Sequence, residues 1–319
     1  MTDTTPRLAS LSLDLDNQWS YLRTHGDPAW RRYPSYLDRV VPRTLALLRR
    51  HRLTITYFVV GRDAAEPRHA PLLRAIADAG HEIGNHSFEH EPWLHRYDRR
   101  RLAAEIDRAH AAIHTATGQH CVGFRGPGFS HSLALIDHLI RRGYLYDCST
   151  FPTFIGPLAR AYYLMSARLS RSERRQRDHL FGTWRAGFLP LRTHYLRARQ
   201  GTLAEIPVTT LPVLKTPIHV SYLMYLAGYS PALARRYFRT ALALLDAFRI
   251  QPSLLLHPLD FLGRDDGVGL DFFPGMDQRR ADKLVLLDEI LALYRSRYTV
   301  VPLWRHARSV PARRIRRLT

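Results

Sequence analysis

Lysine, cysteine and long apolar stretches are scarce in this sequence. Lysine occurs only at Lys215 and Lys283, so almost all of the 47 basic residues are arginine. The two cysteines, Cys121 and Cys148, are too few for a disulfide framework, and we expect both to be reduced thiols buried at strand edges. No run of about 18 apolar residues, the length that spans a bilayer, is present. These absences argue against a disulfide-rich scaffold and against a transmembrane helix.

The start of the chain and its composition indicate a folded, strongly basic protein. The first six residues lack the basic start and apolar core of a secretory signal, so we expect a cytoplasmic protein. With 319 residues, 45% hydrophobic and 11% aromatic, the chain can form one large domain or two small ones. Its net charge of +19 suits nucleic acid, an anionic lipid surface or a phosphorylated substrate. A codon bias toward arginine would give the same excess.

Strand-like and helix-like segments alternate through most of the sequence. Apolar or β-branched runs predict strands over 8–16, 55–60, 82–83, 121–124, 144–147, 253–256 and 298–303. Apolar residues at helical spacing predict helices over 36–50, 71–79, 98–117, 132–142, 231–248 and 279–295. This alternation is typical of parallel βαβ units. Because five or more such units precede residue 154, we expect an α/β barrel rather than an open sheet.

Residues 154–200 interrupt this alternation with arginines and aromatic residues. We interpret the segment as an insertion over the mouth of the barrel. Leu158, Tyr162, Met165 and Leu169 form an apolar stripe beside arginines, which fits either a helix lying on a membrane or a basic helix packed on the domain. The C-terminal residues 305–319 are basic, and we expect them to form a mobile extension.

The segment Gly80–His90 places two histidines, His86 and His90, four residues apart after a glycine-rich turn. In a turn of helix, side chains at this spacing lie about 5–6 Å apart and can share one cation. An accidental pair is the alternative, since the chain contains 17 histidines.

Two aspartates end the first predicted strand, which is the end where barrel enzymes build their sites. Asp14 and Asp16 are two residues apart and therefore point the same way on an extended segment. One carboxylate can bind a cation while the other acts as a base. With His86 and His90 they provide a set of two histidines and one carboxylate, which leaves coordination positions open for water and substrate. The pattern therefore predicts a catalytic metal centre.

Arg125 and His257 also follow predicted strands. Arg125 can hold a nearby carboxylate, such as that of Asp14, by paired hydrogen bonds, or it can be a surface arginine. His257 can protonate a leaving amine, or it can be a hydrogen-bonded core histidine.

Four motifs together make a family resemblance visible. They are Asp14–Asp16, Gly80–His90, Phe124–Phe129 and Leu255–Pro258. Their order and approximate spacing resemble those of the polysaccharide deacetylases, the NodB-homology group or carbohydrate esterase family 4. The resemblance covers 8–147 well and 205–301 loosely.

This resemblance implies a single NodB-homology domain over residues 1–319, folded as a deformed (β/α)7-type barrel related to the TIM barrel. It also implies a divalent metal, with zinc expected and Co²⁺, Ni²⁺ or Mn²⁺ as alternatives, and hydrolysis of an N-acyl amide on a sugar. The roles implied by position are general base for Asp14, metal ligands for Asp16, His86 and His90, orientation of the base for Arg125, and general acid for His257.

The sequence departs from the family pattern in three places. Leu15 separates the two aspartates that are usually adjacent. Gly128 stands where many members have a tyrosine whose backbone N–H assists the oxyanion, which keeps the donor and should widen the pocket. The aspartate-tryptophan motif that tunes the acid histidine is not evident, and Asp147 or Glu205 could replace it.

The leading hypothesis is therefore a metal-dependent N-deacetylase of an amino sugar or glycan. The basic insertion suggests a lipid- or phosphate-linked precursor at the inner membrane face, with peripheral contact to anionic lipid and no specific nucleic acid. One alternative is a deformylase of a lipid-linked amino sugar. Another is a non-catalytic barrel that binds an anionic glycan or nucleic acid. The sequence does not indicate an oligomeric state.

Overall fold

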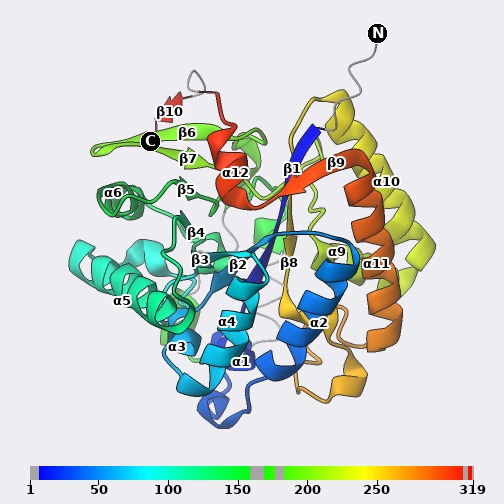
Figure 1. The fold of residues 1–319 in the computed structure, drawn as a ribbon, viewed down its shortest axis with the longest axis horizontal. Coiled ribbons are helices and arrows are strands. Elements are labelled where there is room, and N and C mark those ends of the chain that lie inside the picture. The colour runs from blue at the N-terminus through cyan, green and yellow to red at the C-terminus, as the bar shows by residue number, and fades with distance from the viewer. Residues whose placement is uncertain (1–6, 159–168, 177–182, 312–314, 318–319) are drawn as a thin grey trace.

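The computed structural model describes residues 7–158, 169–176, 183–311 and 315–317. In these residues ten strands form one mixed sheet, and helices connect many of the strands (Figure 1). The strands are β1 (Arg7–Leu15), β2 (Thr56–Val59), β3 (Glu82–Asn85), β4 (Gly123–Phe124), β5 (Tyr146–Asp147), β6 (His194–Ala198), β7 (Gly201–Glu205), β8 (Ser253–Leu256), β9 (Tyr298–Val301) and β10 (Ile315–Arg317). Each predicted strand is present, although several are shorter than expected.

Helices cover the outside of this sheet (Figure 1). They are α1 (Gln18–His25), α2 (Leu37–Arg50), α3 (Gly61–Ala64), α4 (Ala70–Asp78), α5 (Arg99–Thr117), α6 (Leu133–Arg141), α8 (Arg171–Gln176), α9 (Val220–Tyr229), α10 (Pro231–Ala247), α11 (Arg280–Arg297) and α12 (Leu303–Arg308). The six predicted helices match α2, α4, α5, α6, α10 and α11 to within two residues at each end. We missed α1, α3, α8, α9 and α12.

Seven of the strands form a deformed barrel. Adjacent strands pair in the order β7-β5-β4-β3-β2-β1-β8, and every pair in this order is parallel. Residues 206–209 continue β7 and close the ring, because the Thr209 backbone N–H donates to the Ser253 carbonyl of β8 at 3.1 Å. The predicted barrel is therefore confirmed. Strands β9, β6 and β10 are additions, with β9 paired to β1, β6 to β7, and β10 to β6.

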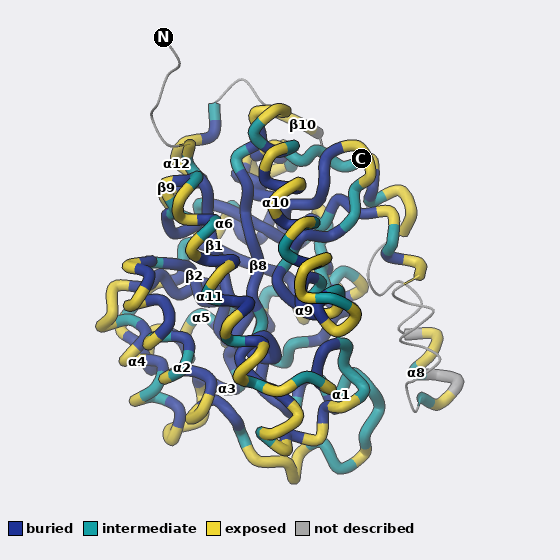
Figure 2. The backbone as a smooth tube through the Cα atoms, turned by 90° about the vertical axis from the view of Figure 1, so that its right-hand side faces the viewer, coloured by how far each residue is buried: buried dark blue, intermediate teal, exposed yellow. Residues whose placement is uncertain are grey.

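Strand β1 is central to the barrel. It pairs with β2, β8 and β9, and seven of its nine residues are buried. Figure 2 shows β1, β2 and β8 as buried tubes inside a layer of partly exposed helices. Strand β1 runs from the top of Figure 1 toward α1 at the bottom, so the carboxyl ends of the parallel strands lie at that lower end. Residues that follow β1, β3, β4 and β8 therefore meet there.

The segments outside the family pattern are more regular than expected. Within 154–200 the structure describes α8 and the sheet strand β6, while Tyr162 and Met165 of the apolar stripe, for which we left a membrane helix and a packed helix open, lie outside the described residues. The prediction of a mobile tail over 305–319 is wrong for 305–311 and 315–317. Leu303 and Ala307 of α12 pack into the core, His306 Nδ1 lies 2.8 Å from Ser10 Oγ, and β10 joins β6.

Two smaller expectations can also be compared with the structure. Both cysteines are free and buried, as predicted. Among the helices of the described residues, none combines the length and the apolar character that crossing a membrane requires.

Candidate active site

The candidate metal ligands meet at the carboxyl ends of β1 and β3. Asp16 follows β1, while His86 and His90 follow β3. Asp16 Oδ1 lies 3.3 Å from His86 Nε2 and 2.9 Å from His90 Nε2. The three side chains each offer one ligand atom, and these atoms all lie within 4.8 Å of one another. The structure therefore brings together the three residues that the sequence predicts as metal ligands.

The His86–His90 segment is not the turn of helix that we considered. Residues 86–90 form a loop in which Ser87 has φ +61° and His90 has φ +51°. These left-handed conformations fold the chain back sharply, and the two imidazole centroids lie 4.9 Å apart. The convergence of the rings depends on this strained backbone rather than on helical spacing.

The contacts around the three side chains suit a metal centre. His86 Nδ1 lies 2.7 Å from the carbonyl of Arg125, which can only accept a hydrogen bond, so in the neutral imidazole the proton is on Nδ1 and Nε2 is free to bind a cation. Within the described chain, Asp16 Oδ1 and His90 Nδ1 are buried atoms without a hydrogen-bond partner. A buried carboxylate oxygen facing two imidazole nitrogens is a donor set that zinc and similar divalent ions bind. The residues therefore fit the expected group.

Electrostatic coupling in this cluster is strong. Burial acts to raise the pKa of Asp16, but the charge of His90 and the proximity of His86 outweigh it and hold the pKa well below its ordinary value. Burial acts to lower the pKa of His86, whereas the carboxylates of Asp14 and Asp16 raise it, and the net pKa is raised. The cluster thus favours a charged Asp16 carboxylate beside a His86 ring that readily takes a proton, and a bound cation would have to displace that proton.

Arg125 and Asp14 form a buried ion pair beside these ligands. Arg125 Nη1 donates to Asp14 Oδ1 at 2.6 Å and to Ser12 Oγ at 2.9 Å, and Arg125 Nε donates to the Cys148 carbonyl at 3.1 Å. The guanidinium also stacks on Phe58, with 4.5 Å between its carbon and the ring centroid. Asp14 Oδ2 remains directed to the metal-ligand cluster, 3.9 Å from His86 Nε2. Arg125 is therefore a buried residue that fixes one oxygen of Asp14.

His257 follows β8 and is held from two sides. Its Nδ1 lies 3.0 Å from Ser221 Oγ on α9, and its backbone N–H donates to Asp260 Oδ2 at 2.8 Å. Neither Asp147 nor Glu205, which we considered as residues tuning His257, occupies this position, so that interpretation is wrong. Sequence reasoning missed Ser221 because α9 itself was missed.

Asp147 and Glu205 instead form a buried acid pair. They lie opposite each other on β5 and β7, and both side chains are fully buried. Ser149 Oγ donates to Asp147 Oδ1 at 2.6 Å and accepts from the Gly126 backbone N–H at 2.7 Å. Burial and the neighbouring Asp147 raise the pKa of Glu205 well above its ordinary value. The pair therefore retains a proton readily and supports the loop that follows Arg125.

Gly128 does not widen the pocket as expected. It has φ +59°, and a Cβ atom at this position would lie 2.7 Å from Pro92 Cβ. Close packing of two loops therefore requires glycine here, since any side chain would be both strained and too close. Its backbone N–H is retained as a potential donor.

A row of aromatic rings, the α9 tyrosine row, leads away from His257 and was not predicted. His219 lies 6.1 Å from His257 between ring centroids, and Tyr222 lies 6.3 Å from His219. Tyr225 follows at 6.2 Å and Tyr229 at a further 5.3 Å. Tyr225 and Tyr229 are 39% and 73% exposed. The spacing of three and four residues along one helix face was the available sequence signal.

Fold and site together define a class: an α/β barrel with two histidines and one carboxylate gathered at the carboxyl ends of its strands. Residues 28–146 match the sequence model of the family described as polysaccharide deacetylase. The resemblance to the polysaccharide deacetylases seen in the sequence is thereby confirmed.

Curated relatives align over parts of the chain. Over 84 residues it is 33% identical to peptidoglycan-N-acetylmuramic acid deacetylase PdaA of Bacillus subtilis, covering 26% of this chain and 31% of that protein. Over 165 residues it is 30% identical to peptidoglycan deacetylase-like protein FGM2 of Gibberella zeae, covering 50% of this chain and 46% of that protein. The chain thus spans about a third to a half of the length of these relatives.

A solved structure resembles the whole chain. It is that of a suspected polysaccharide deacetylase from Mycobacterium smegmatis, which covers 100% of this chain and 95% of its own length with a TM-score of 0.63 and 20% identity. At this identity the likeness establishes the fold.

Proposed function

We propose that this protein is a metal-dependent hydrolase that removes an N-acetyl or other N-acyl group from an amino sugar or glycan. The observation that carries the proposal is the convergence of Asp16, His86 and His90 beside the buried Asp14–Arg125 pair. Structural metal sites usually have four protein ligands, whereas three leave room for water and substrate. The match of residues 28–146 to the polysaccharide deacetylase family model supports the same deacylation chemistry.

Asp16, His86 and His90 would hold the cation, with zinc as the expected ion. A divalent cation bound there would make water more acidic and polarise a carbonyl group. The remaining steps depend on the protein's own groups.

Asp14 is the proposed general base. One of its oxygens accepts from Arg125 and the other faces the ligand cluster, so the side chain is oriented to take a proton from a water molecule there. Arg125 also balances the carboxylate charge of Asp14 in a buried setting.

His257 is the proposed general acid. Its ring is oriented through Nδ1 by Ser221, which leaves Nε2 to deliver a proton to the departing nitrogen. The backbone N–H of Gly128 is the proposed donor to the developing oxyanion. Asp14 and His257 would thus transfer protons, and the Gly128 N–H would stabilise the negative charge on the oxyanion.

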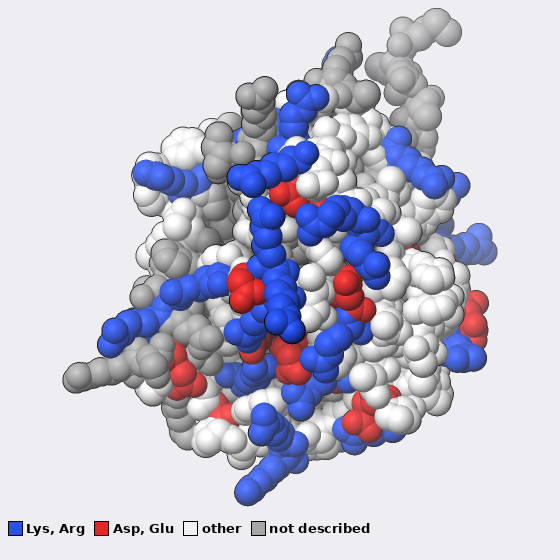
Figure 3. Space-filling view, turned by 90° about the vertical axis from the view of Figure 1, so that its left-hand side faces the viewer, with Lys and Arg blue, Asp and Glu red and all other residues white. Residues whose placement is uncertain are grey.

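The finer proposal concerns the substrate and its location. Exposed arginines gather on the face that carries α5 and α6, where basic side chains stand out in Figure 3. Such a face attracts phosphate-bearing molecules and anionic lipid. We therefore propose a lipid- or phosphate-linked sugar precursor, handled at the cytoplasmic membrane face.

The direct test measures metal content and acid release with the same protein samples. N-acetylated and N-formylated sugars and oligosaccharides, with and without phosphate, would be screened for released acetate or formate. We expect His86→Ala to lose both bound metal and activity. His114→Ala removes an exposed imidazole from α5 and should keep both. Metal content equal in the wild type and His86→Ala would refute the metal centre, and metal binding without acid release from any substrate would refute the hydrolase.

The membrane proposal needs a separate measurement. Cosedimentation with vesicles that contain anionic lipid should decrease with salt and with Arg100→Gln on α5 and Arg141→Gln on α6. Vesicle binding that is unchanged by salt and by these variants would contradict the membrane proposal and would leave the deacetylase proposal unaffected.

A further inference from the structure

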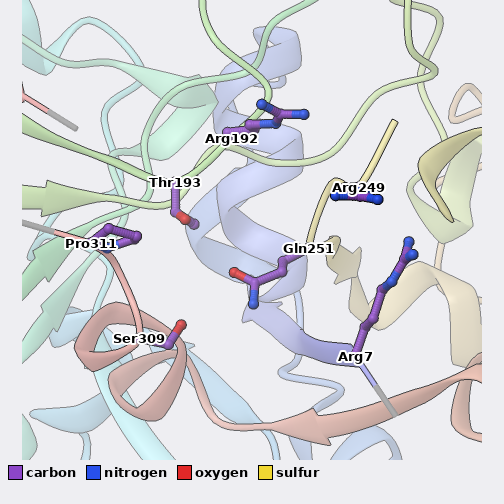
Figure 4. A pocket seen from close by; sticks show the side chains of 7 residues that line it. All are labelled: Arg7, Arg192, Thr193, Arg249, Gln251, Ser309 and Pro311. Carbon is purple, nitrogen blue, oxygen red and sulfur yellow. The ribbon is translucent and has the colours of Figure 1, made fainter. Parts of the chain in front are cut away.

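A cavity of about 260 Å³ lies at the opposite end of the barrel from the metal-ligand cluster. Its lining comes from segments far apart in the sequence: the start of β1, the approaches to β6 and β8, and the segment after α12. The lining residues are Arg7, Arg192, Thr193, Arg249, Gln251, Ser309 and Pro311. Figure 4 shows the three arginines and Gln251 arranged around the opening. We call it the arginine cavity.

The lining of the arginine cavity is rich in hydrogen-bond donors and has no acidic residue. Three guanidinium groups contribute fixed positive charge, while the hydroxyl of Thr193 and the amide of Gln251 add neutral donors. The Ser309 hydroxyl already donates to the His306 carbonyl at 2.7 Å. At ~30 Å³ per molecule, the volume equals roughly nine waters. A hydrated phosphate or a diphosphate is therefore an appropriate size and charge for this space.

The present contacts of two arginines leave most of their donors available. Arg7 Nη1 donates to the Asp246 carbonyl and lies 3.7 Å from Asp246 Oδ1. Arg192 Nη2 donates to the Phe248 carbonyl at 2.6 Å. Each guanidinium has five N–H donors, and these contacts anchor it at the end of α10 without neutralising Arg192.

Arg249 is the most informative member of the cavity. It lies between α10 and β8 with φ +51°, a left-handed conformation that arginine seldom adopts. Its side chain is exposed and lines the cavity with the other two arginines. Crowding of three like charges around one space is unfavourable until an anion occupies it.

We propose that the arginine cavity binds the phosphate group of a small molecule, either free phosphate or a phosphate ester. The site is separate from the proposed hydrolase and does not depend on it. Because β1 begins at Arg7 and ends beside Asp14 and Asp16, a bound anion would also stabilise the strand that carries the candidate site.

The experiment is titration calorimetry of the full chain with inorganic phosphate, diphosphate and glucose 6-phosphate, at low and moderate salt. We expect saturable binding with one site, weakened by salt. Preference for inorganic phosphate or diphosphate would identify a free anion as the ligand, and preference for the ester would identify a phosphorylated metabolite. Thermal unfolding in the same solutions should shift to higher temperature as the sites fill.

Two variants assign the binding to the arginine cavity. Arg249→Asn removes the charge but suits the left-handed backbone, and Arg192→Gln keeps a donor for the Phe248 carbonyl. Each should weaken phosphate binding by about tenfold, the effect of one charge-assisted contact. Arg236→Gln near the start of α10 makes the same charge change away from both the arginine cavity and the α5–α6 face, and this variant should bind as the wild type does. Equal weakening in all three variants, unchanged binding in the two cavity variants, or no binding by the wild type would each overturn the proposal.

Discussion

Arg125 Nη1 and Asp14 Oδ1 lie 2.6 Å apart where water hardly reaches them, with exposed fractions of 0% and 4%. Both charged groups are buried away from water, so each is stabilised electrostatically by the opposite charge of the other. The contact joins the ends of β4 and β1, which are not neighbours in the barrel. It therefore contributes to the fold and to the orientation of the proposed base.

Asp14→Asn should impair both activity and stability. The variant leaves the Arg125 charge buried without its partner, and loss of one member of such a pair costs about 3–5 kcal/mol in the free energy of unfolding. Loss of a general base should lower kcat by about 10²–10⁴-fold. Metal content should remain, since the three proposed ligands are intact. Urea unfolding, acid release and metal analysis of one preparation check these outcomes.

Ser12→Ala is the matched control for Asp14→Asn. It removes the other side-chain contact of Arg125 Nη1 but keeps the carboxylate. We expect a loss of about 1 kcal/mol in stability and nearly unchanged kcat. If Ser12→Ala lost as much activity as Asp14→Asn, the base assignment would give way to a purely structural role for the ion pair.

Ser221→Ala should affect the acid step through His257. Ser221 contacts Nδ1 of His257, the ring nitrogen that does not deliver the proton, and it also hydrogen-bonds Asp260, so it is a positioning residue. One neutral hydrogen bond is worth about 1 kcal/mol, which corresponds to a decrease in kcat of about fivefold with little change in KM. Ser221→Thr keeps the hydroxyl and should restore kcat. A change confined to KM, or no recovery in the threonine variant, would contradict this role.

Glu205→Gln should change how stability depends on pH. The pKa of Glu205 is raised in the folded protein by burial and by Asp147, so the folded state keeps a proton that the unfolded chain releases above about pH 4.3. This contribution to stability is fully present below that pH and is lost as pH rises through the folded-state pKa, by about 1.4 kcal/mol per pH unit at most. Glutamine does not titrate and can donate to Asp147.

The measurement is urea unfolding of the wild type and Glu205→Gln at pH 5 and pH 8. Raising the pH should move the difference in unfolding free energy in favour of the variant. Glu66→Gln removes an exposed carboxylate and should show no such trend. A constant difference at both pH values would mean that Glu205 has an ordinary pKa.

The ends of β1, β3, β4 and β8 could be located from the sequence because apolar runs stop there at acidic, histidine or arginine residues. Asp14, Arg125 and His257 could be predicted as site residues from their positions at the ends of these apolar runs alone. The partners across the barrel could not be predicted. Asp147 faces Glu205 because β5 and β7 pair in one register, and that register depends on the barrel as a whole.

Helix α9 was missed for a different reason. Its sequence is almost entirely apolar and aromatic, so it lacks the polar face by which a surface helix is recognised. Without α9, neither Ser221 nor the α9 tyrosine row could be placed near His257. The His86–His90 loop was misjudged because its two left-handed residues, Ser87 and His90, are not glycine or asparagine.

The α9 tyrosine row predicts a preference for longer glycans. Flat aromatic faces bind the apolar faces of sugar rings, and the spacings of 5.3–6.3 Å between successive rings continue from His219 to the exposed Tyr229. A sugar chain with one unit at His257 would reach Tyr229 only when it is several units long. Tyr229→Ala should therefore lower kcat/KM for an N-acetylglucosamine tetramer by about two- to tenfold, with the monomer unaffected.

Two further variants separate stacking from other effects of the substitution. Tyr229→Phe keeps the ring and should retain the wild-type preference for the tetramer, although it removes the hydroxyl that contacts Tyr225. Phe248→Ala removes an exposed ring near the arginine cavity, at the other end of the barrel, and should not change kcat/KM for either substrate. A sugar-binding surface distant from His257 affects only substrates long enough to reach it. If Tyr229→Ala lowered kcat/KM equally for the monomer and the tetramer, the α9 tyrosine row would therefore stabilise α9 rather than bind sugar.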